Sequence, residues 1–193
     1  MDFANYWASA IATADLGDTI EQSLRFGSGW LYNSSITISN TSTFSCWVKI
    51  SNSATYEYLL GGGASTDTGY IVWQGNQSGR FCVRTSSGSF NNYSDNSFRD
   101  SSAWYHIVMQ VDASGNCKLF VNNDQQTSTR TVGGTDSAIV IGNNLTSNSD
   151  DEWRGYIAQV YYVSDQILAP TEFGKYNEDG VWVPQDYTGS YGT

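Results

Sequence analysis

Short apolar runs that alternate with polar residues recur along this chain, and each ends at Gly, Asn, Ser or Asp. Successive side chains of a strand point to opposite faces, so the alternation predicts strands with one buried face. The turn residues recur about every 8–12 residues, which is typical of a sandwich. A parallel crossover needs about a dozen residues or more, and the gaps between the runs leave no room for one. The chain is therefore predicted to be all-β, with two antiparallel sheets.

The predicted strands fall between residues 23 and 163. Two hairpins are the clearest local predictions, one around Gly115 and one around Asn123, because Gly and Asn tolerate the positive φ of tight turns. Further turns are predicted at 61–63 and 77–79. The strands are expected at 23–26, 30–32, 43–50, 56–61, 69–74, 80–85, 88–93, 104–112, 118–122, 125–129, 138–142 and 155–163.

The two ends of the chain differ from this pattern. Residues 1–22 are interpreted as an N-terminal arm, with a short helix as the alternative over 6–14, and residues 23–176 as the single domain. Pro170, followed by Gly174, predicts one short helix or 3₁₀ turn. Residues 177–193 are expected to form an extended tail without a strand, lying over the sandwich or leading into further chain.

Composition excludes several classes of function. A net charge of −10 with scattered basic residues offers no basic stripe for nucleic acid or anionic lipid. The N-terminus has neither a basic segment nor the continuous apolar run of a signal peptide, and no segment approaches the roughly 20 apolar residues of a membrane span. Three cysteines at long spacings predict neither a disulfide framework nor a metal pair, and Cys46 is expected in the core beside Phe44 and Val48.

Three blocks in order resemble the LamG-like family of concanavalin A-like jelly rolls. They are SLRFG with FSCWVK at 23–27 and 44–49, WYHIV with KLFVN at 104–108 and 118–122, and IVIGN with WRGYIAQVY at 139–143 and 153–161. The resemblance spans about residues 23–176 and implies a two-sheet antiparallel jelly-roll sandwich. The chain has Ala158 and Gln159 where the family often has Asp-Glu, which removes two carboxylates.

The closing run at 173–193 resembles the segment that follows this domain in virion structural proteins of aquatic tailed phages. In those proteins the chain usually continues with another apolar strand. The resemblance implies that these 193 residues are one part of a longer product.

No catalytic residues are predicted. A glycosidase needs two carboxylates a few ångströms apart, and the related laminarinases alternate theirs along one strand. Asp150, Asp151 and Glu152 are consecutive, so neighbouring side chains of an extended chain point in different directions. His106, the single histidine, is interpreted as structural, on the face of its strand shared with Trp104 and Val108, and one histidine excludes a histidine-rich zinc site.

Two groups of residues are candidates for ligand binding. Aromatic rings beside amides suit a sugar, because the rings stack on pyranose faces and the amides bind hydroxyl groups; the alternative is that such rings simply fill the core. Hard oxygen ligands in the loop at 143–151 would suit Ca²⁺, as in the edge loops of pentraxins, whereas the alternative there is a solvated turn. The predicted ligand-binding residues are Trp73, Asn91, Tyr93, Asn143, Asp150 and Asp151.

The two resemblances imply a non-enzymatic structural or adhesion module of a phage particle, serving as a decoration, fibre or tail-associated protein. Its partners would be other virion subunits and a host-surface glycan, with no nucleic acid and no membrane insertion. A homo-oligomer is expected, since Tyr and Trp are enriched at interfaces. The resemblance implies that it is assembled in the host cytoplasm and located in the virion. The alternatives are a free-standing lectin that uses calcium and a degenerate glycosidase.

Overall fold

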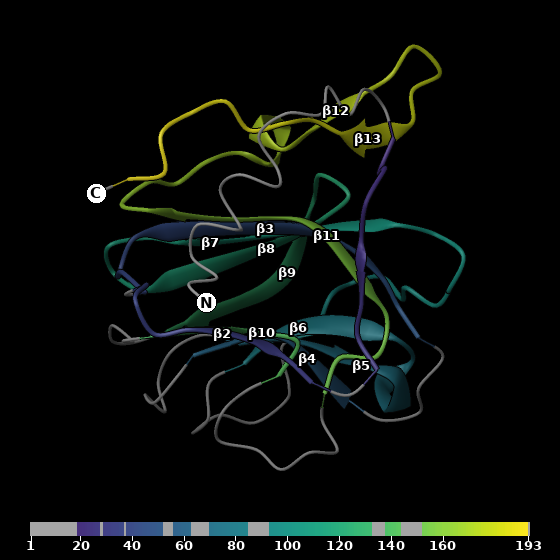
Figure 1. Ribbon diagram of the computed structural model, residues 1–193, viewed down its shortest axis with the longest axis horizontal. Coiled ribbons are helices and arrows are strands. Elements are labelled where there is room, and N and C mark those ends of the chain that lie inside the picture. The colour runs from purple at the N-terminus through teal and green to yellow at the C-terminus, as the bar shows by residue number, and fades with distance from the viewer. Residues whose placement is uncertain are drawn as a thin grey trace.

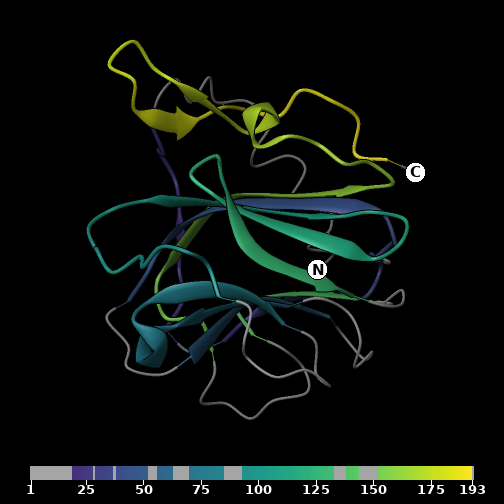
Figure 2. The ribbon, with the colours of Figure 1, turned by 180° about the vertical axis from the view of Figure 1, so that it is seen from behind.

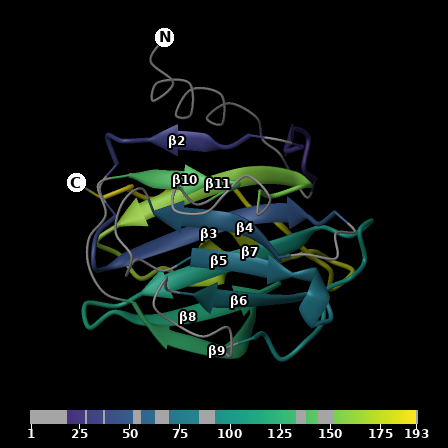
Figure 3. The ribbon, with the colours of Figure 1, turned by 90° about the horizontal axis from the view of Figure 1, so that it is seen from below.

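The computed structural model describes residues 19–27, 29–36, 38–51, 56–62, 70–84, 93–132, 138–143 and 152–192. Two large antiparallel sheets stack face to face (Figure 1), as predicted. The large sheet has the order β1 (Leu24–Arg25), β11 (Tyr156–Ser164), β3 (Ser42–Lys49), β7 (Tyr105–Val111), β8 (Asn116–Val121) and β9 (Asp124–Thr131). The small sheet has the order β2 (Leu31–Asn33), β10 (Ile139–Ile141), β4 (Tyr56–Gly62), β5 (Tyr70–Gln74) and β6 (Arg80–Arg84), side by side in Figure 3.

The core lies between the inner faces of the two sheets. On β3, Phe44, Cys46 and Val48 point into it, while the intervening Ser45 and Trp47 belong to the other face of the sheet. The predicted position of Cys46 is confirmed, and all three cysteines are buried thiols outside any disulfide. Strand alternation therefore places these apolar side chains on the inner face of the sheet, as the sequence pattern predicts.

The two predicted hairpins are confirmed, and each has a physical cause. Asn122 and Asn123 have φ values of 51° and 71° between β8 and β9, the left-handed conformation that a two-residue hairpin turn requires. Gly115 between β7 and β8 has a φ of 78°, and a Cβ there would lie 2.0 Å from the Val132 carbonyl oxygen. Only glycine fits this position, so the turn could be predicted from the sequence.

The prediction of a tail without a strand is wrong. Strands β12 (Gly174–Tyr176) and β13 (Trp182–Pro184) form a separate antiparallel hairpin, which lies above the outer face of the large sheet in both Figure 1 and Figure 2. Each strand has three residues, too few for an alternating pattern to stand out in the sequence. The 3₁₀ turn η2 (Pro170–Glu172) before the hairpin is at its predicted place.

Two other predictions concern segments that lie mostly outside the described residues. Of the strand expected at 88–93, only Tyr93 is described, and it forms an isolated bridge with Cys82. Residues 1–18 of the N-terminal arm lie outside the described part, so the arm remains a prediction. No helix in the described ranges has the length and hydropathy needed to cross a bilayer.

Candidate functional site

The outer face of the large sheet is covered by the C-terminal hairpin and the chain that leads into it. Thr43 on β3 accepts a hydrogen bond from the Leu168 backbone N–H (2.9 Å), and Gln110 on β7 donates to the Leu168 carbonyl (2.8 Å). Beside these contacts, Phe173 and Tyr187 pack on outward-facing side chains of the sheet. The part of this face formed by β3, β7 and β11 is therefore covered.

A stack of three rings holds the hairpin on the sheet. The ring of His106 lies between Trp47, at 4.8 Å between centroids, and Trp182 of β13, at 5.9 Å. Trp182 Nε1–H donates to His106 Nδ1 (3.1 Å), and His106 Nε2 lies 2.8 Å from Ser45 Oγ. Because an indole only donates, Nδ1 must be unprotonated and Nε2 must carry the proton.

Burial fixes the chemistry of this histidine. His106 is fully buried, and desolvation lowers its pKa from 6.5 to about 3. A neutral imidazole with both nitrogen atoms engaged cannot take a proton from a substrate at neutral pH. The interpretation of His106 as a structural residue agrees with this geometry.

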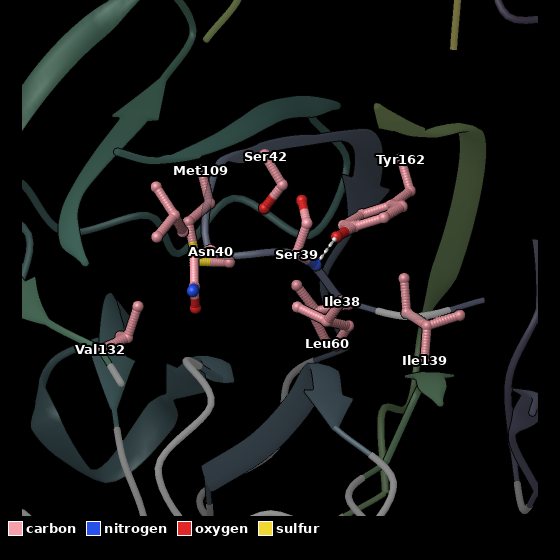
Figure 4. A pocket seen from close by; sticks show the side chains of 10 residues that line it. Ile38, Ser39, Asn40, Ser42, Leu60, Met109, Val132, Ile139 and Tyr162 are labelled. Atoms are coloured by element: carbon pink, nitrogen blue, oxygen red, sulfur yellow. Dashed lines mark hydrogen bonds between the residues drawn. The ribbon is translucent and has the colours of Figure 1, made fainter. Parts of the chain in front are cut away.

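A small pocket opens between the two sheets at one end of the sandwich (Figure 4). Leu60, Met109 and Ile139 line it, and the Tyr162 hydroxyl at its wall accepts a hydrogen bond from the Ser39 backbone N–H (2.9 Å). Its volume of about 20 Å³ has room for roughly one water molecule. This pocket is too small for a sugar.

The outer face of the small sheet, here called the small-sheet face, is buried in its middle and partly exposed at its margin, at Tyr56, Arg84 and Tyr93. Backbone pairing places five residues in one row across it: Glu152, Tyr58, Val72, Cys82 and Tyr93. Tyr58, Val72 and Cys82 in the middle are buried and form an apolar cluster that is separate from the core. Tyr93 at one end of the row is half-buried.

Aromatic and polar groups meet at the margin of this cluster. The guanidinium of Arg84 lies 5.9 Å from the centroid of the Tyr58 ring and donates a hydrogen bond to the Tyr58 hydroxyl. Tyr56 stands edge to face with Tyr58, at 6.2 Å between centroids. Burial, together with the nearby Cys82, raises the pKa of Tyr93, so its hydroxyl keeps its proton and can donate. Half-buried tyrosines beside a guanidinium offer apolar area and fixed donors together.

Of the predicted ligand-binding residues, the structure places Tyr93 on this face, buries Asn143 near its edge and turns Trp73 into the core. Tyr93 ends the row, and Asn143 is buried just after β10, where Gly142 N–H bonds to the Leu59 carbonyl (2.9 Å) next to Tyr58. Trp73 instead faces the core: it is 3% exposed, and its indole N–H bonds to the Phe98 carbonyl (3.2 Å). Its position on β5 points it inward, so its ring cannot stack on a sugar. Asn91, Asp150 and Asp151 lie outside the described residues.

Glu57 is a buried acid that the sequence pattern did not single out. It is 0% exposed, and its two carboxylate oxygens accept hydrogen bonds from the Arg154 backbone N–H (2.9 Å) and the Ser51 hydroxyl (3.1 Å). The signal that marks it is an acid inside an otherwise apolar strand. These bonds tie β4 to the start of β11, which is a structural role. In the described ranges, no three acids, histidines or cysteines are grouped to hold a metal.

A family model described as the concanavalin A-like lectin/glucanases superfamily matches residues 27–172. The chain belongs to this superfamily. The match confirms the fold that the three sequence blocks predicted, whereas nothing in it concerns a phage. A search of curated proteins found no match.

Three solved structures illustrate how this superfamily fold recurs. A protein of Bacteroides ovatus, for which carbohydrate binding has been proposed, is similar over 77% of this chain and 45% of its own, with a TM-score of 0.57 and 11% identity. A sialidase of Trypanosoma rangeli, solved with sialic acid, is similar over 66% of this chain and 21% of its own, with a TM-score of 0.53 and 17% identity. A heptameric pentraxin from Limulus polyphemus is similar over 77% of this chain and 70% of the pentraxin chain, with a TM-score of 0.50 and 13% identity. At these identities the likeness shows the fold alone.

Proposed function

We propose that this domain is a non-enzymatic adhesion module of a phage particle that binds a surface glycan at the small-sheet face. The observation that carries the glycan site is the group of Tyr56, Arg84 and Tyr93, which are partly exposed around the buried Tyr58 on that face. Tyrosine rings give a sugar apolar contact, and a guanidinium gives it donors in a fixed geometry. The neighbouring folds that bind or act on carbohydrate support this choice of ligand class.

The absence of an enzymatic role is part of the same proposal. Glycoside hydrolysis needs an acid and a second carboxylate that face the same bond. The carboxylate of Glu57 is already bonded to backbone and hydroxyl donors, and Glu152, the other acid of this region that the structure describes, is buried next to Tyr58. Binding without turnover is what such a face supports.

The place in a virion rests on the resemblance of the closing run at 173–193 to phage structural proteins. In this structure that run packs on the large sheet as the C-terminal hairpin, leaving the small-sheet face on the opposite side of the domain. A module held through the rest of a particle could then present this face outward. A free-standing lectin with calcium in the 143–151 loop is the second candidate, and it rests on the Asn and Asp side chains of that loop.

Glycan-array binding tests the proposal, with calcium and then with EDTA. We expect specific binding that Arg84→Ala weakens about ten- to hundredfold, because a hydrogen bond from a charged group contributes roughly 1.5–3 kcal/mol. Tyr176→Ala, which changes an exposed tyrosine on the C-terminal hairpin, is the matched control and should bind like the wild type.

Three outcomes would count against parts of the proposal. Equal binding by the Arg84→Ala variant, with its fold shown intact by circular dichroism, would remove the site from the small-sheet face. Binding lost on chelation would favour the calcium-dependent lectin. Shortened glycans after incubation would contradict the non-enzymatic assignment.

A further inference from the structure

The edge formed by β1 is the feature that points beyond a single copy of the chain. β1 is the outermost strand of the large sheet and, within the described residues, pairs only with β11. The purple segment that holds it runs along the side of the sandwich from the large sheet to the small sheet (Figure 1). Unpaired backbone N–H and C=O groups along such an edge are a template for another strand.

Exposed apolar side chains lie on β1, on its neighbour β11, and on and just before β2, the edge strand of the small sheet. Leu24 on β1 is 55% exposed, and Tyr32 on β2 is 53% exposed. Trp30, which precedes β2, and Tyr156, which pairs with Arg25, are exposed as well. Large apolar groups gathered along an unpaired edge mark an interaction site.

The charges of the edge segment are self-complementary. Glu21 and Arg25 are both exposed, and Ser23 lies midway between them. If residues 21–25 paired antiparallel with the same residues of a second copy, on a twofold axis through Ser23, each Glu21 would stand opposite the partner's Arg25. The two Leu24 side chains would be diagonal neighbours on one face, which is within contact distance across a strand pair.

We propose that the β1 edge is a homodimer interface, in which residues 21–25 of two copies pair antiparallel and extend the large sheet across both. An isologous contact of this kind closes on itself, so it forms a dimer and not a fibre. The exposed side chains at Trp30 and Tyr32 add apolar area beside the strand pair, since a standard interface buries about 800 Å² per partner. Two joined copies would also present two small-sheet faces, which raises avidity for a repetitive glycan surface.

Charge reversal in the full chain tests this interface by sedimentation equilibrium over a concentration series. Wild type should be a dimer, and Arg25→Glu should weaken dimerisation about tenfold, because it sets like charges opposite each other twice. Glu21→Arg should do the same. The double variant Glu21→Arg/Arg25→Glu should restore the dimer, since it only exchanges the two sides of each pair. Lys118→Glu, an equal charge change on β8 away from this edge, is the control.

Three results would overturn the β1 interface. The first is a monomeric wild type, and the second is a double variant that stays dissociated. The third is a dimer that is lost when residues 1–18 are deleted but is unchanged by Arg25→Glu and by Glu21→Arg. That result would assign the contact to the N-terminal segment instead. None of these results bears on glycan binding by Arg84, so the two proposals can fail independently.

Discussion

Phe173→Ala should destabilise the protein by about 3–5 kcal/mol, the usual cost of removing a fully buried aromatic ring. Phe173 is 0% exposed and lies 5.4 Å from the Tyr161 ring and 5.1 Å from the Tyr187 ring, measured between centroids. These three rings join the large sheet to the chain on both sides of the C-terminal hairpin. Urea unfolding followed by near-ultraviolet circular dichroism measures the loss.

Val181→Ala is the matched control for this prediction. Val181 belongs to the same hairpin but is 55% exposed, so its truncation should change stability by less than about 0.5 kcal/mol. If Phe173→Ala cost no more than Val181→Ala, the hairpin would not be part of the cooperative fold. The large sheet would then have an outer face open to ligands.

Acid should weaken the fold well above the pH at which carboxylates are protonated, because of His106. Burial lowers the pKa of this histidine to about 3, whereas the unfolded chain binds the proton near 6.5. Below pH 6.5 the histidine therefore binds a proton in the unfolded state but not in the folded state. The free energy of unfolding then falls by about 1.4 kcal/mol per pH unit. This loss is absent above pH 6.5 and continues as the pH falls toward 3.

The surroundings of His106 allow the loss of stability between about pH 4.5 and 6.5 to be assigned to this residue. The groups that face its ring are Trp47 and Ser45 from β3 and Trp182 from β13, and none of them titrates in this range. Hydrogen bonds lower the pKa values of several surface carboxyls, so their stabilisation is lost only as the pH falls below the unfolded value near 3.9. These carboxyls are Asp95, Asp100 and Asp112. Between about pH 4.5 and 6.5, His106 is the expected source of the slope.

Two measurements check the histidine directly. The chain has a single histidine, so its ring ¹⁵N resonances are unambiguous and should show the neutral form, protonated at Nε2, down to pH 4.5. His106→Gln should flatten the dependence of the unfolding free energy on pH in the same window. A ring that titrates near 6.5 would contradict the buried stack.

The sandwich could be predicted from the sequence because its causes are local. Strand alternation places Cys46 in the core, and the turns at Gly115 and Asn123 need residues that accept positive φ. The place of Ala158 and Gln159, where the family often has two acids, is a bulge in the pairing of β11 with β3, and Gln159 has a φ of 45°. The sequence identified this position as unusual but did not indicate its conformation.

The small-sheet face could be predicted only in part. Alternation alone cannot say which of two adjacent residues faces the core, so the sequence leaves Trp73 between a sugar contact and a core ring, and the structure places it in the core. The contact between Arg84 and Tyr58 joins residues on strands separated by β5, and nothing local in the sequence relates them. The stack of His106 on Trp182 is equally non-local, because it depends on a hairpin too short to be recognised.

The central claim is that glycan binds at the small-sheet face, and an NMR titration tests it most directly. The ¹⁵N-labelled protein is titrated with the strongest-binding glycan of the array. We expect amide shifts at residues 56–58, 80–84 and 93, and none at 174–184 on the C-terminal hairpin. Shifts confined to the hairpin, or no shifts from any glycan, would contradict the claim and leave the particle's other subunits as its partners.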